Sequence, residues 1–357
     1  MREIRALTSL RGFAALAVVL QHFSATAQAH ALHRIPSLVP HGYIAVDFFF
    51  VLSGFIMSYT YLDRFTGGVP GAYADFLARR VARVAPLNVA VVILIMFCGV
   101  TSSALLGRNL FFDAGVGWFD VLANMLMLQG LGIGHNMNGP SWSISVEFVA
   151  YLTFPLLVML NFHRAMVVRA AMGVLSFGAL FALAFSSADI SRETVWLVPS
   201  LMRCFSEFSL GMLGFWVFRS GRFSIIGSDE AVILLLGGVA ASMLLRVDLP
   251  AMLLFPFVVV ACARNTGIAS RVLGSSVPYF LGLVSYSLYL MHNMFRIPLL
   301  AALRAVHPMP LETVPALAFA LAGALFVIPF AWLAYLWVER PGRNVVRHML
   351  HARPRVA

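Results

Sequence analysis

A histidine and an arginine stand eleven positions apart in a strongly apolar segment, as Arg11 and His22. Eleven residues make close to three turns of an α-helix, so both side chains project from one helix face, about 16.5 Å apart along the axis. Imidazole is suited to act as a general base near neutral pH, and guanidinium is suited to bind anions. His22 is also explained as a neutral ring hydrogen-bonded to a neighbouring helix, and Arg11 as an anchor at the membrane surface.

Two carboxylates begin later apolar segments. Asp47 lies in the run Val46–Phe55 (VDFFFVLSGF), and Glu147 ends the run Trp142–Glu147 (WSISVE). Counting inward from the expected helix ends, both reach nearly the depth of His22. A buried carboxylate beside an imidazole orients the ring. Glu147 is expected to orient His22, and Asp47 is the second candidate for this role. In isolation Asp47 also suits a helix cap.

A third group is basic. Arg79, Arg80 and Arg83 precede an apolar run, with Arg79 and Arg83 on one helical face. A cluster of guanidinium groups beside a membrane cavity suits a phosphate-rich ligand. The alternative interpretation is an ordinary cluster of cytoplasmic arginines that sets orientation in the membrane.

The elements that must position these residues are membrane helices. The 357 residues are 61% hydrophobic and 11% charged, which excludes a water-soluble globular enzyme. A helix needs about 20 apolar residues to cross the hydrocarbon core, which predicts an all-α polytopic protein with about ten crossings. The expected helices lie near residues 7–27, 43–62, 84–106, 141–160, 167–187, 194–218, 231–245, 249–263, 278–302 and 313–338.

Arginine placement predicts the orientation. With the N-terminus inside, 17 of the 25 basic residues lie in cytoplasmic segments and 5 in outer loops, as the positive-inside rule requires. Both termini are therefore expected in the cytoplasm, and the net charge of +10 does not indicate nucleic-acid binding. The apolar stretch 118–131 is short for a crossing and is expected to be re-entrant or interfacial. We predict one transmembrane domain over residues 1–340, followed by a short basic cytoplasmic tail over 341–357.

The three cysteines do not suggest a metal site. Cys98, Cys204 and Cys262 fall inside separate apolar runs, without the paired spacing that zinc sites use. They are expected to be small buried hydrophobic residues, and no metal is predicted.

Taken together, the chain resembles acyltransferase family 3, the integral membrane O-acyltransferases. The resemblance rests on motifs that follow one another in the family's order along nearly the whole chain. These are Leu10-Arg11-Gly12 with His22, Val46–Phe55, Arg79-Arg80 with Arg83 and Pro86, Trp142–Glu147, Arg203 with Phe208 and Gly211, Ser285–His292, and Glu339-Arg340-Pro341. Ala45 stands where the family often has glycine, and Phe148-Val149 replaces a Glu-Gln pair common in members with a fused extracytoplasmic domain, so stand-alone members are the expected relatives.

The resemblance implies transfer of an acyl group, first of all acetyl, from cytoplasmic acyl-CoA to a hydroxyl of a glycan or lipid-linked sugar at the inner (plasma) membrane. It implies that His22 is the essential residue and that Arg11, Arg79, Arg80 and Arg83 hold the donor. A sugar hydroxyl needs a base, whereas a thiolate leaves readily, so one imidazole suffices. Weaker candidates for substrate binding or for stabilising the oxyanion are Ser53, Trp142, Ser143, Arg203, Tyr286 and His292.

Two other interpretations compete with this one. A proton-coupled transporter or flippase could use buried His, Asp and Glu as a proton relay, although such proteins often show inverted repeats, which we do not find here. The other large family of membrane-bound acyltransferases also uses an intramembrane histidine. The Arg11 to His22 spacing and the Trp142–Glu147 motif favour family 3 over that family. The oligomeric state is not predicted.

Overall fold

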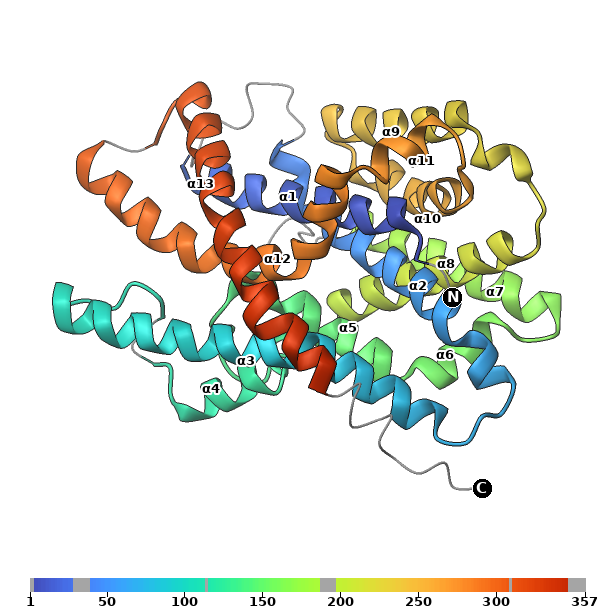
Figure 1. Cartoon of the computed structure of the whole chain (residues 1–357), viewed down its shortest axis with the longest axis horizontal. Coiled ribbons are helices and arrows are strands. Elements are labelled where there is room, and N and C mark those ends of the chain that lie inside the picture. The colour runs from blue at the N-terminus through green and yellow to red at the C-terminus, as the bar shows by residue number, and fades with distance from the viewer. Residues whose placement is uncertain (1–2, 28–38, 113–114, 187–196, 308–309, 346–357) are drawn as a thin grey trace.

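The computed structural model describes residues 3–27, 39–112, 115–186, 197–307 and 310–345, and these form helices joined by loops, with no strand among them. The all-α prediction is confirmed for this part of the chain. The helices (Figure 1) are α1 (Arg5–Ala27), α2 (Ala45–Thr66), α3 (Ala72–Leu106), α4 (Trp118–Met125), α5 (Trp142–Leu152), α6 (Phe154–Asn161), α7 (Met166–Ala184), α8 (Leu197–Arg219), α9 (Asp229–Leu244), α10 (Asp248–Arg264), α11 (Ile268–Leu273), α12 (Ser276–Val306) and α13 (Thr313–Ala334). The basic tail predicted over 341–357 lies outside the described residues from residue 346 onward.

Six helical segments in the described residues are long and apolar enough to cross a membrane, or seven if α5 and α6 form one bent crossing. They establish a multi-pass membrane protein. The difference from ten has a physical cause. Helices α9 and α10 have only 16 and 17 residues. The 31-residue α12 carries polar residues in its middle, from Ser285 to Asn293, which lower its mean hydropathy. Ten crossings and cytoplasmic termini remain predictions.

The helix expected over 141–160 is broken. Helices α5 and α6 meet at an angle of 66° around Thr153. Pro155 lies in the first turn of α6 and cannot donate a hydrogen bond to the carbonyl of Tyr151, so α5 cannot continue straight through it. The single straight helix predicted here is wrong, although Glu147 does lie on the helix that was expected to carry it.

Helix α3 begins earlier than expected, at Ala72 rather than near residue 84, so the arginine cluster lies within the helix and not at its entry. The stretch 118–131 folds as the short α4 and a 3₁₀ turn, Gln129–Leu131, and is not among the six spans. Asp120 fixes this region by accepting hydrogen bonds from the backbone N–H groups of Gly117 (2.8 Å) and His135 (2.7 Å). These two hydrogen bonds lower the pKa of Asp120 to about 2.

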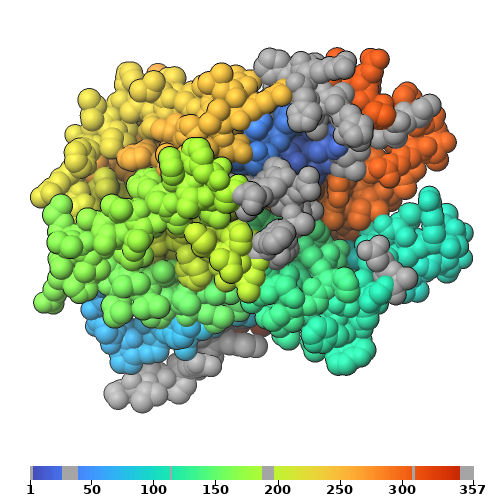
Figure 2. All heavy atoms as spheres, turned by 180° about the vertical axis from the view of Figure 1, so that it is seen from behind, coloured from blue at the N-terminus to red at the C-terminus, as the bar shows by residue number. Residues whose placement is uncertain are grey.

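Two pairs of helices pack through glycine. Helix α1 packs chiefly against α12, and α2 against α8. A Cβ atom on Gly12 would lie 2.5 Å from the backbone nitrogen of Gly282, and one on Gly282 would clash with the carbonyl oxygen of Thr8. Small residues allow membrane helices to approach this closely. In the back view, α1 (dark blue) is visible between the gold segment of α9–α11 and the orange segment of α12 and α13 (Figure 2).

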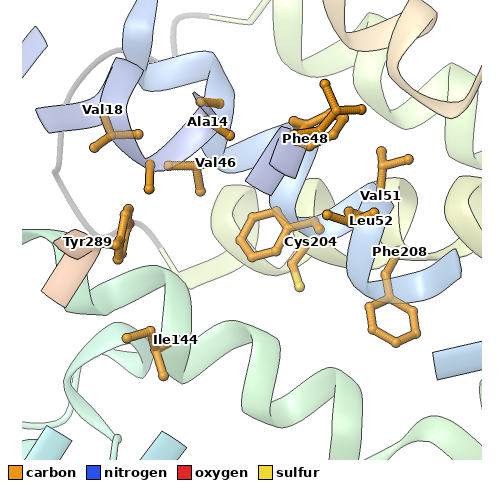
Figure 3. Close-up of a cluster of buried hydrophobic side chains, with 14 of the residues drawn as sticks. Ala14, Val18, Val46, Phe48, Val51, Leu52, Ile144, Cys204, Phe208 and Tyr289 are labelled. Carbon is orange, nitrogen blue, oxygen red and sulfur yellow. The ribbon is translucent and has the colours of Figure 1, made fainter. Parts of the chain in front are cut away.

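Apolar side chains from these pairs fill the space around the polar residues. Val18 of α1, Phe48 of α2, Ile144 of α5 and Phe208 of α8 belong to one cluster of buried residues (Figure 3). Phe208 and Val18 are completely buried. Polar groups enclosed by such a cluster need partners within the protein, which makes their hydrogen bonds informative.

Candidate active site

A cavity of about 250 Å³ lies among α1, α2, α3, α5 and α12. Helix α1 contributes Arg11, α3 contributes Arg80 and Arg83, and α5 contributes Glu147. Three guanidinium groups and one carboxylate line this cavity, so its net charge favours an anionic ligand. The other polar residues that line it are Ser53, Ser143, Tyr151, Ser285, Tyr286 and Tyr289.

A second cavity, of about 310 Å³, adjoins the first because Arg80 and Arg83 line both. Its other lining residues include Tyr61, Arg79 and Arg343, so four arginines surround it. The Nε atoms of Arg80 and Arg343 are buried without a hydrogen-bond partner among the described residues. Unpaired buried donors are costly, and an acceptor group of a ligand would satisfy them.

Glu339 holds two of these arginines in place. Its carboxylate is completely buried, forms an ion pair with Arg343, lies 4.0 Å from Arg83, and accepts a hydrogen bond of 2.8 Å from the hydroxyl of Ser287. Sequence reasoning did not assign Glu339 and Arg343 to the site. Their i, i+4 spacing near the arginine-rich end of the chain was the signal that could have indicated them.

Glu147 is connected to Ser53 through Tyr151. The Tyr151 hydroxyl donates to the Glu147 carboxylate at 2.5 Å, and the Ser53 hydroxyl lies 3.1 Å from the Tyr151 oxygen. Because the Tyr151 proton is used on Glu147, the Ser53 hydroxyl must be the donor to Tyr151. Glu147 thus accepts a hydrogen bond from Tyr151. The role of Glu147 in orienting His22 stays a prediction.

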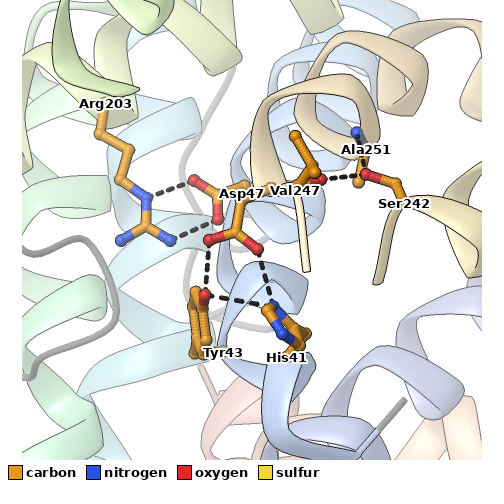
Figure 4. A network of polar contacts seen from close by, with 8 residues as sticks. His41, Tyr43, Asp47, Arg203, Ser242, Val247 and Ala251 are labelled. Atoms are coloured by element: carbon orange, nitrogen blue, oxygen red, sulfur yellow. Dashed lines mark hydrogen bonds and ion pairs between the residues drawn. The ribbon is translucent and has the colours of Figure 1, made fainter. Parts of the chain in front are cut away.

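Asp47 forms a buried ion pair with Arg203. Its carboxylate is completely buried and forms two hydrogen bonds with the guanidinium of Arg203, which joins α2 to α8 (Figure 4). The Arg203 guanidinium also lies over the Trp142 ring, 5.7 Å from its centroid. Close by, His41 and Tyr43 contact each other at 3.3 Å. A bidentate, buried pair of this kind fixes helix positions, and sequence spacing alone could not match Asp47 with Arg203.

His22 lies against another histidine. Its Nδ1 atom is 3.2 Å from Nε2 of His292 and 2.9 Å from the carbonyl oxygen of Val18. His292 is completely buried, and its ring lies 6.1 Å, between centroids, from that of Tyr289, which lines the first cavity. His292 thus lies beside one lining residue of the first cavity, Tyr289, while neither histidine is itself among the lining residues. Arg11 contacts α12 as well, by donating to the Ser285 hydroxyl at 3.2 Å, so the predicted shared face of Arg11 and His22 is confirmed.

The remaining candidates occupy the cavity wall. The Tyr286 hydroxyl donates to the carbonyl of Val84 at 2.6 Å and so joins α12 to α3. The Ser143 hydroxyl lies 2.8 Å from that of Tyr289. The sequence-predicted residues thus fall into four places. The first cavity is lined by Arg11, Ser53, Arg80, Arg83, Ser143, Glu147 and Tyr286, and the second is lined by Arg79. His22 pairs with His292, and Asp47, Arg203 and Trp142 form a separate group.

In the described part of the chain, no three His, Cys, Asp or Glu side chains come together in a way that could hold a metal ion. Cys204 and Cys262 are buried, as predicted, and Cys98 is half-buried.

Comparison with known proteins identifies the family of the chain. The chain is 30% identical over 257 residues to the acyltransferase MdmB of Streptomyces mycarofaciens, covering 65% of this chain and 62% of that protein. It is 24% identical over 396 aligned positions to SACOL0978 of Staphylococcus aureus (strain COL), which is named as a candidate O-acetyltransferase, covering 99% of this chain and 59% of that protein. The third relative, YrhL of Bacillus subtilis (strain 168), is named as a candidate peptidoglycan O-acetyltransferase and is 26% identical over 171 residues, or 45% of this chain and 25% of that one.

The chain spans about three fifths of the length of MdmB and of SACOL0978 in these matches. No solved structure matches it. The family model described as an acyltransferase domain, that of acyltransferase family 3, matches residues 4–336, nearly the whole chain. With its multi-pass helical fold and its polar cavity, the chain belongs to acyltransferase family 3.

Proposed function

We propose that this protein moves an acyl group, first of all acetyl, from cytoplasmic acyl-CoA to a hydroxyl of a glycan or lipid-linked sugar, at the inner (plasma) membrane. The observation that carries the proposal is the pair of adjoining cavities that share Arg80 and Arg83, with Tyr289 of the first cavity beside His292, the partner of His22. Arginines would hold the charged end of the donor, and the imidazole would activate the acceptor.

The cavity sizes favour a divided donor site. The first cavity measures about 250 Å³ and the second about 310 Å³, and both are small for pockets that hold a drug-sized molecule. Coenzyme A is larger than that, with phosphates at one end and a slender pantetheine arm at the other. We assign its phosphates to the second cavity, with Arg79, Arg80, Arg83 and Arg343, and its arm to the first, with Arg11 beside it. Unpaired Nε atoms on Arg80 and Arg343 support this assignment.

The proposed chemistry uses His22 as the base. His22 takes the proton from the acceptor hydroxyl while the hydroxyl oxygen attacks the thioester carbonyl carbon. The tetrahedral intermediate then breaks its C–S bond, and the leaving thiolate of CoA takes the proton back from His22, which returns the enzyme to its starting state. The products are the O-acyl ester and free CoA.

Glu147 and Ser53 have different roles in this proposal. Glu147 lines the first cavity together with Arg11, Arg80 and Arg83, so it balances part of their charge and limits how tightly an anion is held there. Ser53 lines the same cavity and is the candidate that we retain for hydrogen bonding to the oxyanion.

A glycan acceptor is supported by the name of one relative, YrhL, which gives peptidoglycan as the acceptor. Membership of an acyltransferase family, together with arginines around the cavities, favours acyl transfer over the proton-coupled transporter. The test addresses both the donor and the acceptor.

The test uses the purified protein in lipid nanodiscs with acetyl-CoA, and measures CoA release by chromatography, with and without glycan from the host envelope. Replacing His22 with Ala is expected to lower glycan-dependent CoA release by about 10²- to 10⁴-fold, the usual contribution of a general base. His163, an exposed histidine, provides the control, and His163→Ala is expected to leave the rate unchanged. Full activity in folded His22→Ala would reject the base assignment, and no CoA release from the unaltered protein would reject acyl-CoA as the donor.

A further inference from the structure

We propose that His292 is a positioning residue that fixes the protonation pattern of His22, so that the Nε2 atom of His22 carries the lone pair that accepts the substrate proton. The inference rests on the proposed function, because it gives the base a defined tautomer. It assigns the orienting role to a neutral imidazole of α12 instead of a carboxylate.

The two ring nitrogens of His292 have different partners. Nδ1 lies 2.6 Å from the carbonyl oxygen of Tyr289, and Nε2 lies 3.2 Å from Nδ1 of His22. A carbonyl oxygen can only accept a hydrogen bond, so Nδ1 of His292 must carry the hydrogen. Because His292 is completely buried, the neutral ring with a single N–H is favoured. Its Nε2 atom is then an acceptor.

The contacts of Nδ1 determine the tautomer of His22 in the same way. Nδ1 of His22 lies 2.9 Å from the carbonyl oxygen of Val18, again an acceptor only, and faces the accepting Nε2 of His292. Both neighbours require an N–H group at Nδ1 of His22. In a neutral ring this leaves Nε2 as the basic nitrogen. The choice of tautomer is thus transmitted from a backbone carbonyl of α12 through His292 to His22.

The positions of both rings are fixed by the backbone. The Tyr289 carbonyl belongs to the same helix as His292, and the Val18 carbonyl to the same helix as His22. The two helices are held in close contact where Gly12 meets Gly282. The planes of the two rings differ by 38°, and their centroids are 4.9 Å apart. Neither ring can turn over without losing a hydrogen bond to a carbonyl.

The test compares two substitutions of His292 by kinetics in nanodiscs. His292→Leu removes the acceptor and is expected to lower kcat by about 10- to 100-fold, the usual cost of losing a group that orients a functional histidine, with the KM for acetyl-CoA changed less than about 2-fold. His292→Gln places a carboxamide near the position of Nε2, where its oxygen can accept from His22, and should restore most of kcat. Met294→Leu, at a buried position of the same helix, is the control and should match the unaltered protein.

A spectroscopic measurement tests the tautomer without relying on activity. In ¹⁵N-histidine-labelled protein, the His22 signals are identified by their loss in His22→Gln. We expect the Nδ1–H pattern in the unaltered protein and in His292→Gln, and a mixture with Nε2–H in His292→Leu. An unchanged His22 tautomer and unchanged kcat in His292→Leu would overturn this inference while leaving the proposed function intact. Full activity of His22→Ala would overturn the proposed function itself.

Discussion

At the scale of single residues, Arg80 and Arg83 are the groups common to both cavities. Arg83 lies near the buried Glu339, while Arg80 donates to the Tyr61 hydroxyl at 3.1 Å and its guanidinium lies 5.5 Å from the centroid of the Tyr61 ring. These neighbours hold long, flexible side chains in place before a ligand arrives. A preorganised guanidinium loses less conformational entropy on binding a phosphate.

Changing the second cavity should therefore affect donor binding. Arg343→Ala, and separately Arg79→Ala combined with Arg80→Ala, is expected to raise the KM for acetyl-CoA by about 10-fold or more, since a charge-assisted hydrogen bond contributes about 1.5–3 kcal/mol. The KM for S-acetyl-pantetheine, which lacks the nucleotide, should change much less. The measurement is initial rate against donor concentration for both thioesters. Arg271→Ala, an exposed arginine outside both cavities, is the control. An unchanged KM for acetyl-CoA would return these arginines to the role of orientation signals.

How far the sequence predicted the site also depends on the residue. Helical geometry correctly placed Arg11 and His22 on one face, because that needs only local spacing. The pairing of Asp47 with Arg203 and of His22 with His292 joins residues 156 and 270 positions apart, which depends on how the helices pack. The spacing of side chains along one helix contains no such information.

At the scale of elements, the contact between α1 and α12 positions the two histidines. Gly12 and Gly282 lie where the helix backbones meet, and any larger side chain must push them apart. In membrane helices such close packing, rather than a hydrophobic driving force, stabilises the pair.

Gly12→Ala is expected to destabilise the protein by about 1–3 kcal/mol, as overpacking of a close contact does. The measurement is the midpoint of thermal unfolding of the detergent-solubilised protein. Gly178→Ala, on α7, is the matched control, because a Cβ there meets no atom within 4 Å. It should be neutral or slightly stabilising, since alanine is the better helix former. Equal midpoints for the two variants would show that the glycine contact is not tight in the membrane protein.

The sequence predicted some helices correctly and missed other features of the helices. Long apolar runs such as residues 313–338 and 167–187 correspond to helices α13 and α7 within a few residues, because hydropathy and helix length determine them directly. The break at Thr153 was missed, although Pro155 was visible, because proline is tolerated in many membrane helices. The early start of α3 was missed since its first turns are polar.

At the scale of the whole molecule, the number of crossings decides which residues face the cytoplasm. Helix α9 has 16 residues and a length of about 24 Å, shorter than the usual hydrocarbon core of about 30 Å. If α9 crosses, its two ends lie on opposite sides of the membrane. If only the six long spans cross, the two ends of α9 lie on the same side of the membrane.

Single cysteines can distinguish these arrangements. In a background with Cys98, Cys204 and Cys262 replaced by Ala, we expect Leu245→Cys to react with a membrane-impermeant maleimide in intact cells, and Ser224→Cys to react only after permeabilisation. Both positions are exposed. With the N-terminus inside, Leu106→Cys at the end of α3 is expected outside in both arrangements and is the positive control. Equal labelling at residues 224 and 245 would show that α9 does not cross, and the ten-crossing topology would then be wrong.

The sharing of Arg80 and Arg83 between two small cavities has a consequence for transport of the acyl group. Under the proposed function, the nucleotide half of the donor stays bound in the second cavity, and only its pantetheine arm enters the first cavity. The spent thiol then withdraws along the path by which it came. Each catalytic cycle would thus deliver an acyl group toward the side of the bilayer opposite the cytoplasm, while coenzyme A stays in the cell.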